Sequence, residues 1–245
     1  MSPTTTGSPV GAGPAPGPGA VGVLAAMERE RLVHVVRGDS ARDAAATIEA
    51  AVAGGVRIVE VTYTVPGASD LISSLAGRDG ITLGAGTVRT PAEAEAALAA
   101  GARFLVSPNL DLDVVRLAVT SDVLVVPGIL TATEAQSALG AGAPAVKLFP
   151  ASAVGPDYIR ALHGPMPELR VMPSGGIGPT NVAAWLDAGA FAVGMGGGLS
   201  PAGPIDDAAR AAITEAATAA LGAISSATQT VHRTAPRTAN RGARS

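Results

Sequence analysis

The chain has 245 residues, no cysteine and a formal net charge of −3, and only 2% of its residues are aromatic. The lack of cysteine excludes disulfides, cysteine nucleophiles and thiolate metal ligands. The negative charge and the few aromatics argue against a nucleic-acid or anionic-membrane partner. No apolar run reaches the ~18–20 residues needed to cross a bilayer, and no signal peptide is evident, so we expect a cytoplasmic location.

Both ends of the chain have the composition of tails. Residues 1–21 are mostly Pro, Gly, Ala, Ser and Thr, which offer too little apolar surface to offset the entropy of ordering. Residues 226–245 contain four arginines and no acidic residue, as is typical of a solvated basic tail. We therefore predict disordered tails at both ends and one domain over residues 22–225.

Between the tails, short apolar runs typical of β-strands recur at near-equal intervals. Most are followed by a turn and an Ala-rich stretch of helical character, and several of these stretches open on Ser or Thr and close on Gly, as helix caps do. Eight such units predict a parallel (β/α)₈ TIM barrel in a single domain, with a doubly wound open sheet as the alternative. The predicted strands are 32–36, 57–62, 81–85, 103–107, 122–126, 145–149, 170–174 and 191–195.

Lys147 is the only lysine in the chain and lies within an apolar predicted strand, AVKLF. A buried lysine is costly unless it is paired or functional. Because arginine is the usual cation of this chain, position 147 points to a need for a primary amine, which can form a Schiff base with a carbonyl, as guanidinium cannot. The alternative is a strand-end lysine paired with a carboxylate.

Glu60 lies between two valines in the strand RIVEVT. Strand alternation places Glu60 and Thr62 on one face and both valines on the other. If the valines meet the helices, Glu60 points into the barrel lumen. There it is either the partner of Lys147 or a general base whose pKa burial has raised.

The last two predicted strands end in glycine-rich turns, at 173–181 and 194–199. Barrels of this class often bind phosphate on the loops after strands seven and eight, through bare backbone amides. Gly175, Gly176, Gly196 and Gly197 fit that role, although glycines also serve tight turns.

Five segments carry longer motifs in a fixed order: GGVRIVEVTYTVPGA (54–68), GAGTVRTPAEAEAALAAGARFLVSP (84–108), PGILTATEA (127–135), VKLFPASAVGP (146–156) and PSGGIGPTN (173–181). They resemble the bacterial 2-keto-3-deoxy-6-phosphogluconate (KDPG) aldolases, a family that also handles 4-hydroxy-2-oxoglutarate (KHG). The resemblance spans roughly residues 30–222 and implies a homotrimeric class I aldolase acting on a small keto acid.

By this resemblance, Lys147 is the Schiff-base lysine and Glu60 the general acid/base. Thr87 and Pro108 would line the pyruvate pocket. The protonated imine would serve as the electron sink, so we expect neither a metal nor a cofactor. The substrate implied is KDPG, cleaved to pyruvate and glyceraldehyde 3-phosphate.

The phosphate site of the family commonly has Thr-Gly-Gly, where this chain has Ser174 followed by Gly175 and Gly176. Ser174 keeps the hydroxyl. At Gly197 many members have Ser, so one phosphate donor is lost here, and this departure leaves the choice of phosphorylated substrate open.

Some family members have an arginine shortly after the glutamate, as in E-V-T-L-R. This chain has Thr64 at that position. Members with T-x-T-V-P instead have arginine at the end of strand one, where this chain has Arg37. Its fork suits a carboxylate or phosphate, with a barrel-rim charge as the alternative. We count Thr64 and Arg37 among the candidate substrate ligands.

Three alternative functions stay open from the sequence. The first is a related lysine-dependent aldolase for 4-hydroxy-2-oxoglutarate or the galactonate epimer. The second is a phosphate-binding barrel isomerase or synthase without imine chemistry, and the third is a non-catalytic barrel.

Overall fold

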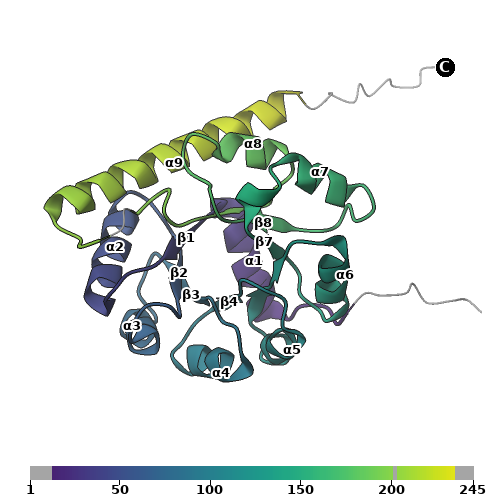
Figure 1. The fold of residues 1–245 in the computed structure, drawn as a ribbon, viewed down its shortest axis with the longest axis horizontal. Coiled ribbons are helices and arrows are strands. Elements are labelled where there is room, and N and C mark those ends of the chain that lie inside the picture. Colours follow the sequence, from purple (N-terminus) through teal and green to yellow (C-terminus); the bar gives the residue numbers. More distant parts are fainter. Residues whose placement is uncertain (1–12, 201–202, 235–245) are drawn as a thin grey trace, which may run out of the picture.

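The computed structural model describes residues 13–200 and 203–234, with side chains described as far as residue 228. Its strands form a curled parallel sheet that encloses a lumen, with helices outside it (Figure 1). The strands are β1 (Leu32–Val36), β2 (Ile58–Thr62), β3 (Thr82–Gly86), β4 (Phe104–Val106), β5 (Leu124–Val126), β6 (Gly128–Ile129), β7 (Val146–Leu148), β8 (Val171–Pro173) and β9 (Val193–Met195).

β5 and β6 are two halves of one barrel strand, separated by Pro127. Proline has no N–H to donate to a ladder. The segment before Pro127, β5, pairs with β4, and the segment after it, β6, pairs with β7. An isolated parallel bridge between Ser174 and Gly194 connects β8 to β9. The ring is therefore a closed barrel of eight strand positions in the described residues, and the predicted TIM barrel is confirmed.

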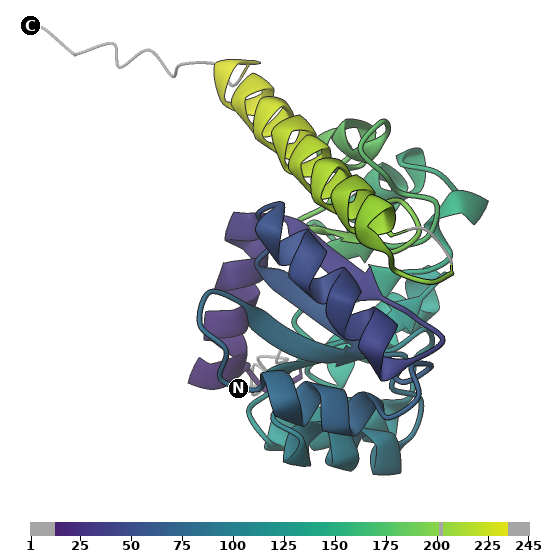
Figure 2. The same cartoon turned by 90° about the vertical axis from the view of Figure 1, so that its left-hand side faces the viewer.

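Helices of the outer layer follow most strands and turn the chain back to the amino end of the barrel (Figures 1 and 2). Side-chain oxygens of Ser40, Thr90, Asp111 and Thr131 cap four of them by accepting from backbone amides of the first turn. The outer elements are α2 (Ala41–Ala53), α3 (Ala68–Leu75), α4 (Pro91–Ala99), α5 (Leu112–Thr120), α6 (Ala132–Gly140), the 3₁₀ turn η1 (Ala151–Ala153), α7 (Asp157–His163), α8 (Val182–Asp187) and α9 (Asp207–Thr234).

The strand faces separate two apolar clusters. In β2, Val59 and Val61 pack in the outer cluster beneath the helices, whereas Ile58 belongs to the cluster that fills the lumen. Alternation then directs Glu60 and Thr62 into the lumen as well. The predicted orientation of Glu60 is confirmed, because both valines meet the helix layer.

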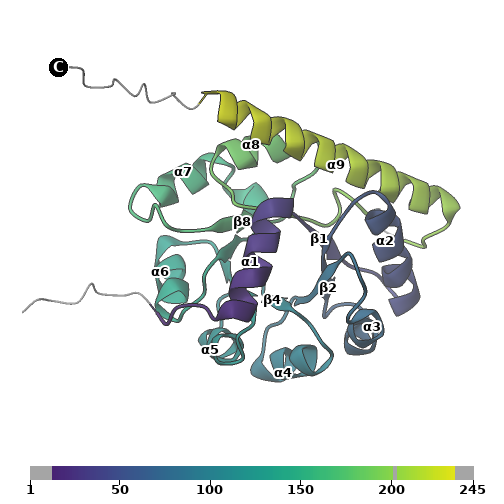
Figure 3. The ribbon, with the colours of Figure 1, turned by 180° about the vertical axis from the view of Figure 1, so that it is seen from behind.

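α1 (Pro18–Glu30) lies across the amino end of the barrel (Figure 3). Its residues Val23, Leu24 and Met27 are buried in the lumen cluster. Its first amides, of Gly19 and Ala20, donate to the carboxylate of Asp122, at 2.9 and 3.2 Å. The helix therefore closes one end of the lumen and is capped by a residue about one hundred positions away.

The structure corrects both predicted tail boundaries. α1 begins at Pro18, within the predicted tail 1–21, because its apolar face is buried against the lumen residues. α9 continues to Thr234, through the first nine residues of the predicted tail 226–245, and packs against α2 and α8. Residues 1–12 and 235–245 of the predicted tails lie outside the described residues. Within the described part of the chain, no helix is long and apolar enough to span a membrane.

Candidate active site

Lys147 and Glu60 meet inside the barrel near the carboxyl ends of their strands. Lys147 is on β7 and Glu60 on β2, and Nζ lies 3.7 Å from Glu60 Oε1. The side chains are 4% and 0% exposed. Lys147 Nζ also lies 5.3 Å from the ring centroid of Phe149, within the range of a cation–π contact. The only lysine of the chain is thus held in a nearly dry lumen against one carboxylate and one aromatic ring.

The Glu60 carboxyl group has few stabilising contacts for a buried acid. Neither of its oxygens has a hydrogen-bond partner among the described residues. Burial raises the pKa of Glu60 above its ordinary value, and the nearby charges of Lys147 and Arg37 offset only part of this effect. Glu60 can therefore hold a proton more readily than a surface carboxyl group, as a group that both takes and returns protons must.

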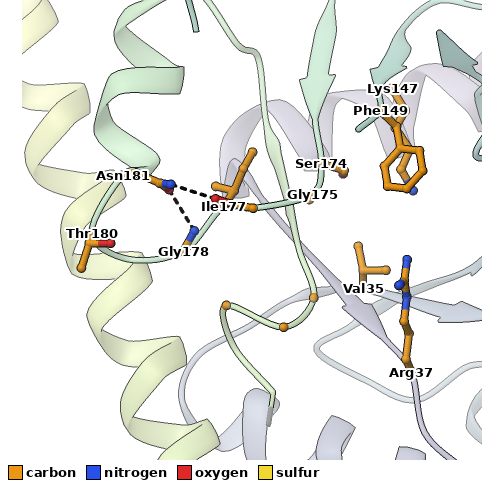
Figure 4. Close-up of a pocket in the computed structure, with 15 residues that line it drawn as sticks. Val35, Arg37, Lys147, Phe149, Ser174, Gly175, Ile177, Gly178, Thr180 and Asn181 are labelled. Atoms are coloured by element: carbon orange, nitrogen blue, oxygen red, sulfur yellow. Dashed lines mark hydrogen bonds between the residues drawn. The ribbon is translucent and has the colours of Figure 1, made fainter. Parts of the chain in front are cut away.

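A cavity of about 460 Å³ opens above this pair at the carboxyl end of the barrel. Lys147 and Phe149 form its inner wall, and the glycine-rich turns after β8 and β9 form its opposite side (Figure 4). Arg37, at the end of β1, is an exposed residue whose guanidinium group points across the mouth toward Lys147 and Phe149 (Figure 4). The cavity therefore has an amine at its base, a cation at its mouth and backbone amides along one side.

The 173–181 loop follows β8 and is held by its own side chains. The Asn181 side chain donates to Gly176 O at 2.8 Å and accepts from Gly178 N at 3.0 Å (Figure 4). Gly175 and Gly176 have φ values of 94° and 78°, a region that favours glycine. Ser174 Oγ is buried and has no hydrogen-bond partner among the described residues, so it is available to a ligand in the cavity.

The 196–200 turn follows β9 and lies beside the 173–181 loop. The amides of Leu199 and Ser200 donate to Gly196 O, at 2.9 and 3.0 Å. A β-carbon at Gly198 would overlap Ile177 O, whereas one at Gly197 would meet nothing within 4 Å. Gly198 is thus required for close packing of the two loops, and Gly197 leaves open space beside the cavity.

The structure brings together most of the residues that the sequence singled out. Glu60 lies beneath the cavity, in contact with Lys147. The cavity lining includes Arg37, Lys147, Ser174, Gly175, Gly176, Gly196 and Gly197.

Thr64, Thr87 and Pro108 are not part of this lining. Thr64 is exposed and its hydroxyl lies 2.7 Å from that of Thr62. Thr87 and Pro108 are half-buried just beyond β3 and β4. The expected roles of Thr64 in substrate binding and of Thr87 and Pro108 in pyruvate binding stay predictions.

Sequence reasoning missed two residues that shape the site. Phe149 is two positions after Lys147 and faces the same cavity, which strand alternation could have indicated. Asn181 ties the 173–181 loop together, and an asparagine just after a Gly-Pro turn is a recognisable signal for such local bonds.

Comparison with known proteins adds independent information about this site. The family model for KDPG and KHG aldolases matches residues 23–216. The chain is 39% identical over 175 residues to the 2-dehydro-3-deoxy-6-phosphogalactonate aldolase of Escherichia coli strain K12, covering 70% of this chain and 85% of that protein.

Two solved structures illustrate the same similarity in three dimensions. The native KDPGal structure has a TM-score of 0.74 and 37% identity, covering 81% of this chain and 96% of the other. The KDPG aldolase of Legionella pneumophila, with pyruvate captured as a covalent carbinolamine intermediate, has a TM-score of 0.72 and 30% identity, covering 80% and 97%. With its fold, its motif order and its matched length in agreement, this chain belongs to the KDPG and KHG aldolase family of carbon–carbon lyases.

Proposed function

We propose that this aldolase cleaves 2-keto-3-deoxy-6-phosphogluconate to pyruvate and glyceraldehyde 3-phosphate, with Lys147 as the imine-forming lysine and Glu60 as the general acid/base. The observation that carries the proposal is the buried pair itself, with 3.7 Å between Lys147 Nζ and Glu60 Oε1 at the base of a cavity. An amine and a carboxyl group at this separation can share the same proton transfers during one reaction.

The reaction begins when the neutral amine of Lys147 adds to the C2 ketone of the substrate. Loss of water from the carbinolamine gives a protonated imine, with Glu60 carrying protons directly or through one water. Glu60 then takes the proton of the C4 hydroxyl, the C3–C4 bond breaks, and its electron pair moves into the imine to give an enamine and a free aldehyde. Protonation at C3 and hydrolysis release pyruvate and restore the amine.

The cavity offers candidate anchors for both ends of the substrate. Arg37 would hold the carboxylate, assisted by Thr87 in the predicted pyruvate pocket. The amides of the two glycine-rich turns and the Ser174 hydroxyl would hold the distal phosphate. Anchoring both ends fixes C2 against the amine, which converts binding energy into orientation.

The test is mass spectrometry of the intact protein after incubation with pyruvate and sodium borohydride. The wild type should gain one pyruvate adduct, and Lys147→Arg should gain none. A folded wild type without an adduct would exclude imine chemistry and leave the isomerase, synthase and non-catalytic alternatives.

The galactonate epimer is a second candidate substrate, favoured by the 39% identity to the phosphogalactonate aldolase of Escherichia coli. The epimers differ at C4, the carbon whose hydroxyl proton Glu60 would remove. Steady-state kinetics with both epimers and with 4-hydroxy-2-oxoglutarate would rank the three keto acids by kcat/KM. A higher value for the galactonate epimer would replace KDPG in this proposal.

The expected homotrimer is also a proposal of this family assignment. Sedimentation equilibrium of the full chain should give three times the monomer mass. A monomeric mass at micromolar concentration would contradict it.

A further inference from the structure

His34 is a buried polar residue that the proposed reaction does not use. It lies on β1, and its neighbours on the outer face, Leu32 and Val36, are apolar core residues. His34 is 0% exposed, and its Nε2 lies 2.8 Å from Ser200 Oγ. This contact joins the first strand of the barrel to the end of the turn that follows the last strand.

Ser200 ends the 196–200 turn, which has few side-chain anchors. Residues 196–198 are glycines and offer no side chain to hold the turn, so Leu199 and Ser200 are its only side-chain anchors within 196–200. Leu199 is buried in the outer cluster. Ser200 also closes the turn, because its amide donates to Gly196 O at 3.0 Å. The hydrogen bond to His34 thus adds a side-chain anchor to a turn that is otherwise held by its own backbone bonds, by buried Leu199 and by the packing of Gly198.

His34 has an energetic cost that an apolar residue would not have. Its Nδ1 is buried and has no hydrogen-bond partner among the described residues. If Nε2 carries the proton and donates to Ser200, Nδ1 keeps an unpaired lone pair, and the opposite tautomer would bury an unpaired N–H. Leaving a buried polar atom unsatisfied costs stability. An apolar side chain would fill this place without that cost, so packing alone does not explain the histidine.

The turn that His34 holds faces the cavity. The amides of Gly197 and Gly198 donate to no backbone carbonyl in the described part of the chain, and both residues line the cavity. Backbone amides bind an anion well only if they are held in place beforehand, since ordering a loose turn consumes binding free energy.

We propose that His34 is a positioning residue which, through Ser200, holds the 196–198 amides in place for the distal phosphate of the substrate. This inference rests on the proposed function only for the identity of the anion. His34 touches neither the substrate nor Lys147 in this arrangement, so it affects binding of the phosphate end and leaves imine formation unchanged.

The test compares His34→Phe and Ser200→Ala with the wild type in two assays. Binding of glycerol 3-phosphate, followed by NMR titration, reports on the phosphate site without any turnover. We expect both variants to raise its dissociation constant roughly five- to tenfold, as the loss of one hydrogen bond implies. The rate of borohydride trapping with pyruvate, which has no phosphate, should stay within about twofold of the wild type.

Two further variants separate positioning from simple stability. Ser200→Thr keeps the hydroxyl and should bind glycerol 3-phosphate about as tightly as the wild type does. Leu32→Ala truncates a buried neighbour on the same strand face and should lower stability without changing the dissociation constant. For phosphorylated substrates, His34→Phe should raise KM and leave kcat within about twofold.

Unchanged glycerol 3-phosphate binding in both His34→Phe and Ser200→Ala would overturn the proposal. Equal losses of glycerol 3-phosphate binding and pyruvate trapping would also overturn it, because they would show general disruption of the barrel. Failure of the wild type to trap pyruvate would refute the proposed aldolase mechanism alone, since the phosphate titration does not depend on it.

Discussion

Gly86 lies directly against the carboxyl group of Glu60, and a β-carbon at position 86 would overlap Glu60 Oε1. The two residues are on adjacent strands, β3 and β2, and Gly86 pairs with Thr62. The missing side chain therefore creates the space in which the carboxyl group faces Lys147. The second glycine of the GAG motif has a steric role in the site, beyond any role in turning the chain.

Gly86→Ala should displace the Glu60 carboxyl group from Lys147. A displacement of about 1 Å can reduce kcat/KM roughly 100-fold, and overpacking should lower the free energy of unfolding by about 1–3 kcal/mol. Steady-state kinetics and urea denaturation measure the two effects. Ala85→Gly, at the neighbouring buried outer position, is the control: it should lower stability and keep most of the activity.

Glu60→Gln should reduce turnover by a factor of about 10²–10⁴, as expected for loss of a general acid/base. It should also change the pH dependence of stability. Because burial raises the pKa of Glu60 from 4.5, the unfolded chain releases this proton at lower pH than the folded chain. The contribution of Glu60 to stability should therefore fall as pH rises from 4.5 toward the raised value. The difference in unfolding free energy between wild type and variant, measured by urea denaturation, should change with pH in this direction, and a difference that is independent of pH would contradict the raised pKa.

Gly197→Ser should be tolerated, because a β-carbon there meets nothing within 4 Å. The added hydroxyl can donate to a phosphate, so KM for a phosphorylated keto acid should fall about two- to fivefold, with little change for an unphosphorylated one. Gly198→Ser is the matched control. Its β-carbon would overlap Ile177 O, so this variant should lose stability and bind phosphorylated substrate more weakly.

Asp122→Ala should weaken the attachment of α1, because the Asp122 carboxylate accepts from the first amides of that helix. Loss of such a cap costs about 0.5–2 kcal/mol, and the φ of 54° at this residue disfavours alanine further. Asp122→Asn keeps one acceptor oxygen and tolerates the positive φ, so it should lose less unfolding free energy than Asp122→Ala. Asp157→Ala, which removes an exposed ion pair with Arg160, should change the unfolding midpoint little.

His34 should make the protein less stable in mild acid. Burial lowers the pKa of His34 from 6.5 to about 4, so between these values the unfolded chain binds a proton that the folded chain does not. The contribution of His34 to stability should decline as pH falls from 6.5 to 4, by up to about 3 kcal/mol in total. His34→Phe should remove this part of the decline in urea denaturation. A variant that declines as steeply as the wild type would show that another group is responsible.

The strands and the catalytic pair could be predicted from sequence because local patterns encode them. Each predicted strand overlaps a strand of the structure, since buried parallel strands form short apolar runs bounded by turns. The orientation of Glu60 could be predicted because valines flank it. Strand alternation places the valines on the face toward the helices and Glu60 on the face toward the lumen. Lys147 could be identified because it is unique in the chain.

The features that sequence did not reveal depend on distant partners. α1 begins in a stretch rich in glycine and proline, and it is stabilised by Asp122 and by the lumen residues rather than by its own helix propensity. The His34–Ser200 contact joins positions 166 residues apart. The role of Gly86 depends on the side chain of an adjacent strand, which a single sequence does not disclose.

Among the described residues, α1 closes the amino end of the barrel, so the lumen opens at the carboxyl end. Val23, Leu24 and Met27 fill its amino end, so water, substrate and products all pass the mouth between Arg37 and the glycine-rich turns. In the proposed reaction, pyruvate is still bound covalently to Lys147 when the C3–C4 bond breaks, whereas the aldehyde fragment is already free. The aldehyde can therefore leave through this mouth before hydrolysis of the imine releases pyruvate. With the amino end closed by α1, the water for that hydrolysis enters by the same opening through which both products leave.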